Sequence, residues 1–338
     1  MQAQRLPGTG QAHSTWIIKV RSAKPEPHPT SLFMLLLAYL PFIPFVLSLA
    51  TEHPSFIVGG SVVTANELPF AAHLLVDNHP KCGAAILSAG WVVTAAHCLT
   101  RNNALINRPL TVKVGDGDGD GKAYRASKLI CHPDYEAGTF KNDIALIRLE
   151  KEISFDRGSQ RIPISVSDIK ANETLRAAGW GQTEAESSSK QLREVEVQTT
   201  SLAVCKLYIA DFQDYSGPQI CTGLTPGKDT CPGDSGGPLF RSENGVLKLV
   251  GLTSYGTYNP NDERKCGGAD TVGVYTHIAH HMAYIEGVTG LSRRELTSER
   301  NQQKVGYLVS AGLKYSARNS VVVLAAMLAT LLSTSTRA

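Results

Sequence analysis

The sequence lacks a strong excess of either charge. Its 338 residues include 33 Lys and Arg against 30 Asp and Glu, which gives a formal net charge of +3. Proteins that bind nucleic acids usually concentrate Lys and Arg in a basic stripe or patch. No stripe of basic residues with interleaved aromatics occurs here, so we expect no nucleic-acid partner.

Metal-binding spacings and internal repeats are also missing. The cysteines form no Cys-x-x-Cys pair, and no cysteine and histidine pair has the spacing that zinc prefers. Four histidines lack carboxylate or cysteine companions at ligand spacing: His132, His277, His280 and His281. No segment recurs with the period of a solenoid or a propeller. We therefore expect no metal, no cofactor and no repeat architecture.

The chain contains enough apolar residues for a sizeable core. It also contains an odd number of cysteines. Hydrophobic residues make up 42% and charged residues 19% of the sequence. Seven cysteines allow three disulfides and one free thiol if the protein folds in an oxidising compartment.

The N-terminal region indicates such a compartment. Residues 31–50 carry no charge and follow an arm with basic residues, as in a secretory signal peptide or signal anchor that could be cleaved after Ala50. A buried core helix is the alternative, but Pro41 and Pro44 would interrupt it. The 33 residues before Met34 are unusual for a signal peptide. The start at Met1 or Met34 and the cleavage of the signal therefore stay open.

The C-terminal region has a polar part and an apolar part. Residues 291–319 are polar and predict a linker, in which Arg293 and Arg294 form a dibasic site open to proteolysis. The apolar run 321–332 is too short for an ordinary membrane-spanning helix. With the small residues 310–312 before it, this run resembles a GPI-anchor signal, whereas its polar ending favours a short amphipathic or disordered tail.

Residues 57–290 have the pattern of one all-β unit. Short runs rich in Val, Ile, Leu and Thr alternate with turn clusters, which predicts a barrel or a sandwich. Helical spacing of apolar residues occurs only near the end of this unit, over residues 278–288.

Four separated motifs resemble the trypsin/chymotrypsin family of serine proteases. They are "IVGG" at 57–60, "CGAAILSAGWVVTAAHC" at 82–98, "FKNDIALIRL" at 140–149 and "GDSGGP" at 233–238. The resemblance implies a fold of two six-stranded antiparallel β-barrels with a C-terminal helix and an active site between the barrels. With the terminal features it divides the chain into an N-terminal arm and signal, an activation peptide, a catalytic domain, and a linker with an apolar tail: residues 1–50, 51–56, 57–290 and 291–338.

The resemblance also implies the chemistry of the site. Ser235 would be the nucleophile, His97 the general acid and base, and Asp143 the group that fixes the histidine tautomer. The backbone N–H groups of Gly233 and Ser235 would form the oxyanion hole. In this family, cleavage before the "IVGG" motif frees an α-amino group, which here would be that of Ile57, and this group pairs with the acid that here is Asp234. The preceding residue is Phe56 rather than Arg or Lys, so the activating protease stays unknown.

Substrate preference follows from the position six residues before Ser235. The aspartate at this position, Asp229, resembles the aspartate at the base of the trypsin specificity pocket. A carboxylate there attracts Arg or Lys by a charge-assisted bond. Ser254, Gly256 and Gly273 match residues that line the same pocket. Tyr255 replaces the usual tryptophan, which leaves the preference at neighbouring subsites open.

The resemblance implies three disulfides: Cys82–Cys98, Cys205–Cys221 and Cys231–Cys266. Cys131 would stay unpaired as a small core residue. Residues 116–121, "DGDGDG", imitate half of a calcium-binding loop, but position twelve would be Ser127 rather than Glu, so a solvated turn is favoured. Asn172 in "NET" is a candidate glycosylation acceptor.

The sequence thus predicts a secreted, trypsin-like serine endopeptidase that is made as a zymogen and cleaves after Arg or Lys. We expect a monomer whose partners are protein or peptide substrates, an activating protease and protease inhibitors. A catalytically silent homologue that acts as a binding or decoy protein is the alternative. Such homologues usually lose a catalytic residue or a pocket glycine, and this chain retains them.

Overall fold

The computed structural model describes residues 60–101, 104–115, 121–182, 189–223, 228–257, 259, 261, 266, 268 and 270–299. The predicted arm, signal and activation peptide, the apolar tail and Ile57 lie outside the described residues. No helix within the described part of the chain is long and apolar enough to span a membrane.

Six strands of the first half close into an antiparallel barrel. Their order around it is β2 (Ala71–Val76), β3 (His79–Ser88), β4 (Trp91–Thr94), β9 (Ala145–Leu149), β8 (Lys122–Cys131) and β7 (Leu110–Val114). Alternation of apolar and polar residues fixes the inner face, as in β7, where Leu110, Val112 and Val114 are buried. Asp77 and Asn78 both have positive φ in the turn between β2 and β3, the backbone that tight hairpins require.

A second antiparallel sheet is formed mainly by the other half of the chain. Its order is β1 (Ser61–Val62), β11 (Arg193–Gln198), β10 (Thr174–Gly179), β13 (Pro238–Glu243), β14 (Val246–Gly256), β15 (Val272–His277) and β12 (Gln219–Gly223). A bridge between Thr199 and Thr222 brings the end of β11 back to β12. The predicted all-β fold is confirmed. The second sheet has seven strands because the short strand β1 pairs with β11. The strands β5 (Thr100–Arg101) and β6 (Ala104–Leu105) form a separate hairpin.

The barrel and the second sheet share a hydrophobic core. Phe70, just before β2, packs edge-on against Phe240 of β13 with ring centroids 5.2 Å apart. His73 of β2 stacks on Trp180 at 4.7 Å. These contacts join the two halves, and the segments that follow β4, precede β9 and precede β13 meet where the halves adjoin.

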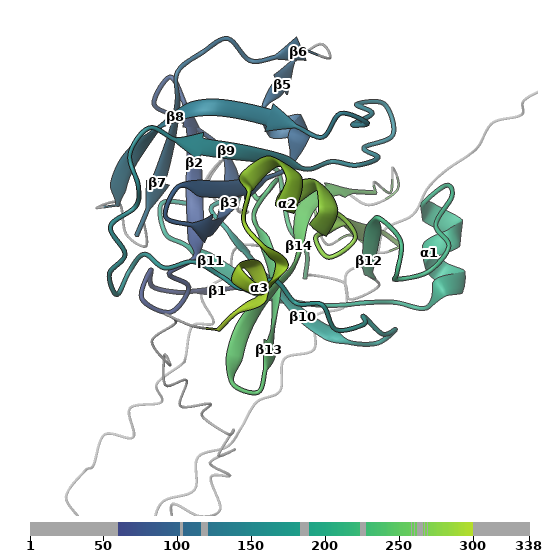
Figure 1. Ribbon diagram of the computed structural model, residues 1–338. Coiled ribbons are helices and arrows are strands. Elements are labelled where there is room, and N and C mark those ends of the chain that lie inside the picture. Colours follow the sequence, from purple (N-terminus) through teal and green to yellow (C-terminus); the bar gives the residue numbers. More distant parts are fainter. Residues whose placement is uncertain are drawn as a thin grey trace, which may run out of the picture. The chain divides into compact units, whose positions relative to one another are not determined.

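Within the residues that the structure describes, four short helices accompany the strands. They are a 3-10 turn η1 (Ala96–Cys98), α1 (Leu202–Tyr208), α2 (Met282–Thr289) and α3 (Arg293–Thr297). The helix predicted at 278–288 is therefore present as α2, which ends at Gly290 with φ of +71°. In Figure 1, α2 lies in front of the strands near the junction of the two halves, and α1 lies at the right-hand side.

The prediction of a linker that begins at residue 291 is wrong for residues 291–299. Ser292 and Glu295 form a capping box that starts α3. Leu296 is 2% exposed, and its carbonyl accepts a hydrogen bond of 2.8 Å from the Ile164 amide. The Arg161 guanidinium donates to the carbonyls of Glu295 and Ser298. The dibasic pair predicted as a cleavage site thus lies in a folded helix rather than in the extended chain that a protease binds.

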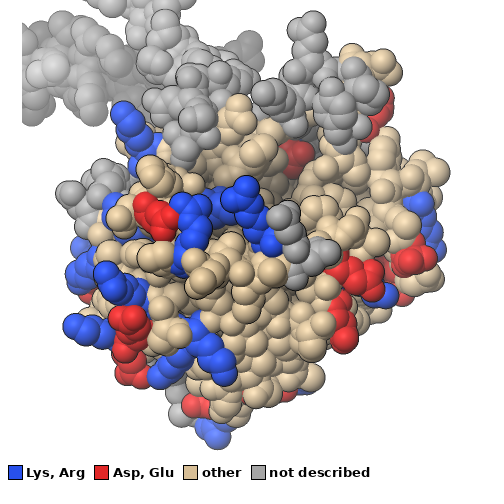
Figure 2. Space-filling view, turned by 90° about the horizontal axis from the view of Figure 1, so that it is seen from above, with Lys and Arg blue, Asp and Glu red and all other residues tan. Residues whose placement is uncertain are grey.

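Charged side chains are unevenly distributed. Figure 2 shows lysines and arginines mainly on the left of the view and a group of acidic side chains on the right. Within the barrel, β8 carries exposed Lys122, Arg125 and Lys128. The acids Asp211 and Asp214 follow α1 on the other half of the molecule.

Candidate active site

His97 and Asp143 meet at one edge of the barrel. Strand β4 leads into η1, which carries His97, and Asp143 lies two residues before β9, the partner of β4. His97 Nδ1 lies 2.7 Å from Asp143 Oδ2, and the His97 backbone N–H donates to Asp143 Oδ1 at 2.9 Å. Because Nδ1 faces the carboxylate, Nε2 is the nitrogen left to exchange protons with a substrate or nucleophile.

Asp143 is fully buried and is held by polar groups of the second sheet. The Ser254 hydroxyl donates to Asp143 Oδ2 at 2.6 Å, and the Thr276 hydroxyl donates to the Asp143 carbonyl at 2.8 Å. A buried carboxylate needs such donors to offset the loss of hydration. The sequence offered Ser254 only as a pocket residue, and it gave no sign of the bond from Thr276.

The loop before β13 brings Ser235 to the same place. The Ser235 carbonyl accepts a hydrogen bond of 2.8 Å from the Gly83 amide of β3. Cys98 Sγ lies 3.6 Å from this carbonyl oxygen and 3.8 Å from His97 Nε2. The structure thus brings His97 and Ser235, which are far apart in the sequence, to one sulfur atom of a disulfide.

The backbone around Ser235 has an unusual shape. Gly233 has φ of +100°, and a Cβ atom there would lie 2.9 Å from Gly181 Cα. Both the conformation and the close approach therefore require glycine. Among the described residues, no acceptor takes the backbone N–H of Gly233 or Ser235. Two amides of one tight loop are thus available to a bound oxygen.

Asp234 lies on the buried side of the same loop. Its side chain is fully buried, and its carboxylate accepts hydrogen bonds from the amides of Gly181 at 2.7 Å and Cys231 at 2.9 Å. Burial raises the pKa of Asp234 to about 6, and the two amides only partly oppose that rise. Within the described part of the chain no cation pairs with Asp234. Ile57, the predicted partner, lies outside that part.

Asp229 is nearly buried beside β14 and β15. It is 8% exposed, and its Oδ1 accepts a bond from the Thr230 amide. A Cβ atom at Gly273 would lie 3.0 Å from Asp229 Oδ1, and one at Gly256 would lie 4.0 Å from Oδ2. The structure thus places two other predicted pocket residues, Gly256 and Gly273, beside the Asp229 carboxylate, and a side chain at position 273 would crowd it.

An aromatic wall that the sequence did not single out flanks His97. The ring of Phe140 lies edge-on to the His97 ring at 5.6 Å and stacks on Tyr255 at 5.1 Å. Phe140 and Tyr255 also line a cavity of about 620 Å³ that includes Glu136 and Phe212. Phe140 was visible in the 140–149 motif, but only the fold places it between the histidine and Tyr255.

All three predicted disulfides are present in the structure: Cys82–Cys98, Cys205–Cys221 and Cys231–Cys266. Cys131 is a free, half-buried thiol, and burial raises its pKa to about 11. A protonated thiol of this kind is a poor nucleophile, in agreement with a core role.

Few side chains of the described residues could hold a metal. They contain one cluster of ligand type, Cys82, His97 and Cys98. Both sulfurs of this cluster belong to the disulfide, so they are not available as thiolates. The acids of the 116–121 segment lie outside the described residues, and Asn172 lies exposed in a turn with φ of +59°.

The comparisons with known proteins agree with this geometry. The family model described as Trypsin matches residues 57–285. The chain belongs to the trypsin family of serine endopeptidases. It is 33% identical to Trypsin 5G1 of Aedes aegypti over 70% of this chain and 85% of that protein, and 33% identical to Trypsin of Squalus acanthias over 70% and 97%. It is also 30% identical to CLIP domain-containing serine protease B4 of Anopheles gambiae, over 68% of this chain and 69% of that protein.

Proposed function

We propose that this trypsin-family protein is an active endopeptidase that cleaves after Arg or Lys and is made as a zymogen. The observation that carries the proposal is the contact of 2.7 Å between His97 Nδ1 and Asp143 Oδ2. His97 Nε2 and the Ser235 carbonyl oxygen lie 3.8 Å and 3.6 Å from the same atom, Cys98 Sγ. In this arrangement Asp143 keeps a proton on Nδ1, so that Nε2 can act as a base.

Catalysis then proceeds in two steps. Ser235 Oγ attacks the carbonyl carbon of the scissile bond while its proton passes to His97 Nε2. The charge that develops on the carbonyl oxygen is stabilised by the N–H groups of Gly233 and Ser235, and one such donor is worth roughly 3 kcal/mol. His97 then gives its proton to the leaving amine, and water repeats the sequence on the acyl-enzyme.

The preference for Arg or Lys rests on Asp229. A nearly buried carboxylate favours a cationic side chain, because a charge-assisted hydrogen bond to the carboxylate is stronger than the contact that an apolar side chain makes there. Gly256 and Gly273 keep the approach to Asp229 open, since neither carries a side chain.

Zymogen activation rests on Asp234. A buried carboxylate whose pKa is about 6 gains stability from a cation, and the α-amino group of Ile57 is the cation that cleavage after Phe56 would supply. Ion pairing would then fix the loop that carries Gly233 and Ser235. Three disulfides support folding in the secretory pathway, because disulfides form in oxidising compartments.

A substrate panel tests the proposal. A Phe56→Arg variant, secreted from a eukaryotic host, is cleaved before Ile57 by immobilised trypsin, which is then removed. We expect hydrolysis of peptide substrates that end in Arg or Lys, and less than about one-hundredth of that kcat/KM for Phe or Leu. Ser235→Ala, treated in the same way, is the matched control. Equal inactivity of both proteins would favour the silent, binding homologue, and cleavage after Phe or Leu would refute the assigned pocket.

A further inference from the structure

Phe140 has an unusual backbone conformation for its residue type. Its φ is +55°, in the left-handed region that is rare for a bulky side chain. In the part of the chain that the structure describes, every other non-glycine residue with positive φ is Asp or Asn, the types that tolerate it best. Such conformations persist where the surrounding structure imposes them, and they concentrate at functional sites. The proposed reaction assigns Phe140 no role, although the residue lies three positions before Asp143.

A short closed loop imposes this conformation. The Glu136 amide donates to the Lys141 carbonyl at 3.1 Å, and the two residues form an antiparallel bridge. Within the loop, the Thr139 hydroxyl donates to Glu136 Oε2 at 3.0 Å. Because the loop is closed on itself, its backbone fixes the direction of the Phe140 side chain, and the ring lies against His97.

The Phe140 ring connects His97 to the second sheet. It lies edge-on to the His97 ring, with centroids 5.6 Å apart and planes at 85°, and it stacks on Tyr255 at 5.1 Å. Edge-on and offset stacked arrangements are the favoured contacts between aromatic rings. Tyr255 follows Ser254, whose hydroxyl donates to Asp143. The strand β14 thus supports His97 from two directions, through Ser254 and Asp143 and through Tyr255 and Phe140.

The contacts of His97 with Asp143 leave one rotation of the imidazole free. Asp143 fixes the ring at Nδ1 and the backbone at the His97 amide. The torsion that turns a histidine ring about its Cβ–Cγ bond has a broad energy profile, so a bond at one corner allows the ring to pivot. The His97 side chain is 21% exposed, which leaves room for this movement. A pivot about Nδ1 displaces Nε2, the nitrogen that exchanges the proton of Ser235 in the proposed reaction.

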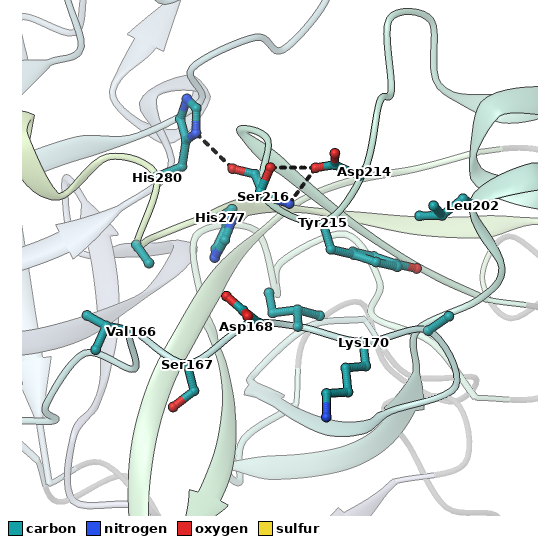
Figure 3. Close-up of a pocket in the computed structure, with 13 residues that line it drawn as sticks. Val166, Ser167, Asp168, Lys170, Leu202, Asp214, Tyr215, Ser216, His277 and His280 are labelled. Carbon is teal, nitrogen blue, oxygen red and sulfur yellow. Dashed lines mark hydrogen bonds between the residues drawn. The ribbon is translucent and has the colours of Figure 1, made fainter.

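Phe140 also borders an open cavity that His97 does not reach. The cavity has a volume of about 620 Å³, and its lining includes Phe140, Tyr255 and Asp214. Figure 3 shows the Ser216 hydroxyl and amide both bonded to Asp214, which fixes this part of the cavity wall. Without the ring of Phe140, the cavity would extend to the flank of His97, and the imidazole would lose the wall on that side.

We propose that Phe140 is a positioning residue, whose ring holds the His97 imidazole at the angle that directs Nε2 to Ser235. This inference rests on the peptidase function proposed above. The left-handed backbone of Phe140 is then the cost of presenting an aromatic ring at this place, since glycine is the residue that adopts such a backbone without strain. Removal of the ring should therefore impair catalysis even where it relieves the backbone.

The test measures how fast Ser235 is labelled by diisopropyl fluorophosphate, a reagent too small to fill the cavity beside Phe140. The Phe56→Arg chain, processed before Ile57, is the parent. We expect Phe140→Ala and Phe140→Gly to lower the labelling rate constant about 10- to 100-fold, and Phe140→Tyr, which keeps the ring, to stay within about threefold of the parent. Phe155→Ala, at an exposed phenylalanine, is the matched control and should label at the parent rate. A loss below about fivefold in both ring-deleting variants, or an equal loss in Phe140→Tyr, would overturn the proposal.

Stability separates positioning from a purely structural role. Phe140→Ala and Phe140→Gly lose the same ring, but only glycine adopts φ of +55° without strain. In urea unfolding of the full chain with Ser235→Ala, the unfolding equilibrium constant should be at least about threefold smaller for Phe140→Gly than for Phe140→Ala. The labelling rates of the two variants should nevertheless be equally low. Recovery of the labelling rate in Phe140→Gly would assign the effect to the stability of the loop and overturn the proposal.

An NMR measurement tests the position of His97 without catalysis. In the processed chain with Ser235→Ala, the Nδ1 proton between His97 and Asp143 is assigned by its absence in a His97→Ala variant. We expect this proton to exchange with water at least about fivefold faster in Phe140→Ala, because the ring opens more often. An unchanged exchange rate would overturn the proposal. Failure of the proposed peptidase activity would instead appear as absent labelling of the processed parent, so the two failures are distinguishable.

Discussion

The unprocessed chain should lose stability through Asp234 as the pH rises, and Asp234→Asn should remove that loss. The pKa of this carboxyl rises from 3.8 to about 6 in the folded protein. Because the unfolded chain releases the proton at lower pH, the contribution of Asp234 is most favourable below pH 3.8 and is lost as the pH rises through 6. At 1.36 kcal/mol per pKa unit, the cost of the buried charge at pH 8 is about 3 kcal/mol.

The assay is urea unfolding at pH 4 and pH 8, in a Ser235→Ala background that prevents self-cleavage. Groups other than Asp234 contribute equally to both proteins, so the difference between the two unfolding free energies isolates Asp234. That difference should shift by about 2 kcal/mol in favour of Asp234→Asn between pH 4 and pH 8.

Processing before Ile57 should reverse the sign. With a free α-amino group beside it, Asp234 becomes the partner of a cation, and Asn at this position would then leave a buried cation unpaired. A pH-independent difference in the unprocessed chain would refute the reasoning about burial. The same difference before and after processing would refute the pairing with Ile57.

Three further substitutions test separate parts of the account. Asp229→Asn should reduce kcat/KM for Arg and Lys substrates by at least about tenfold, the equivalent of one charge-assisted bond, and leave Phe substrates unaffected; equal loss for all substrates would point to a general defect instead. Gly233→Ala should reduce kcat roughly 100-fold or more with little change in KM, because the φ of +100° and the contact with Gly181 Cα both oppose a side chain; a wild-type kcat would show that the loop tolerates it. Leu296→Ala should lower the free energy of unfolding by about 2–5 kcal/mol, since this side chain is 2% exposed. An effect below about 0.5 kcal/mol, the size typical of exposed positions, would instead indicate that residues 291–299 are a linker.

Much of the barrel architecture was predictable, because alternating β-runs and turn clusters are local signals. The resemblance assigned His97, Asp143 and Ser235 to one site between two barrels, and the structure brings their segments together where the barrel meets the second sheet. The resemblance also predicted the three disulfide pairs, because the cysteines follow the family pattern; no local signal in the sequence identifies these pairs.

The features that escaped prediction depend on contacts between distant segments. Residues 291–299 are polar except for Leu291 and Leu296, so composition suggested a linker. The Ser292-x-x-Glu295 capping box was a local signal for the start of a helix. The docking of that helix depends on contacts with the distant Ile164 and Arg161, which the sequence does not show. The position of Phe140 between His97 and Tyr255 likewise requires the fold, because no local pattern brings these residues together.

Four histidines illustrate the same limit. In the sequence, His132 lies in the first half of the chain and His277, His280 and His281 lie in the second half. The fold places the ring centroids of His132 and His281 5.5 Å apart and those of His280 and His281 5.2 Å apart. No local pattern in the sequence predicts these contacts.

The most direct test of the central claim is the stoichiometry of a fluorophosphonate that modifies activated serines. Chain processed before Ile57 should take up one label per molecule, on the peptide that contains Ser235. Uptake should fall by several orders of magnitude in His97→Ala and disappear in Ser235→Ala. Equal labelling of the wild type and His97→Ala, or no labelling of the processed wild type, would contradict the claim that His97 activates Ser235.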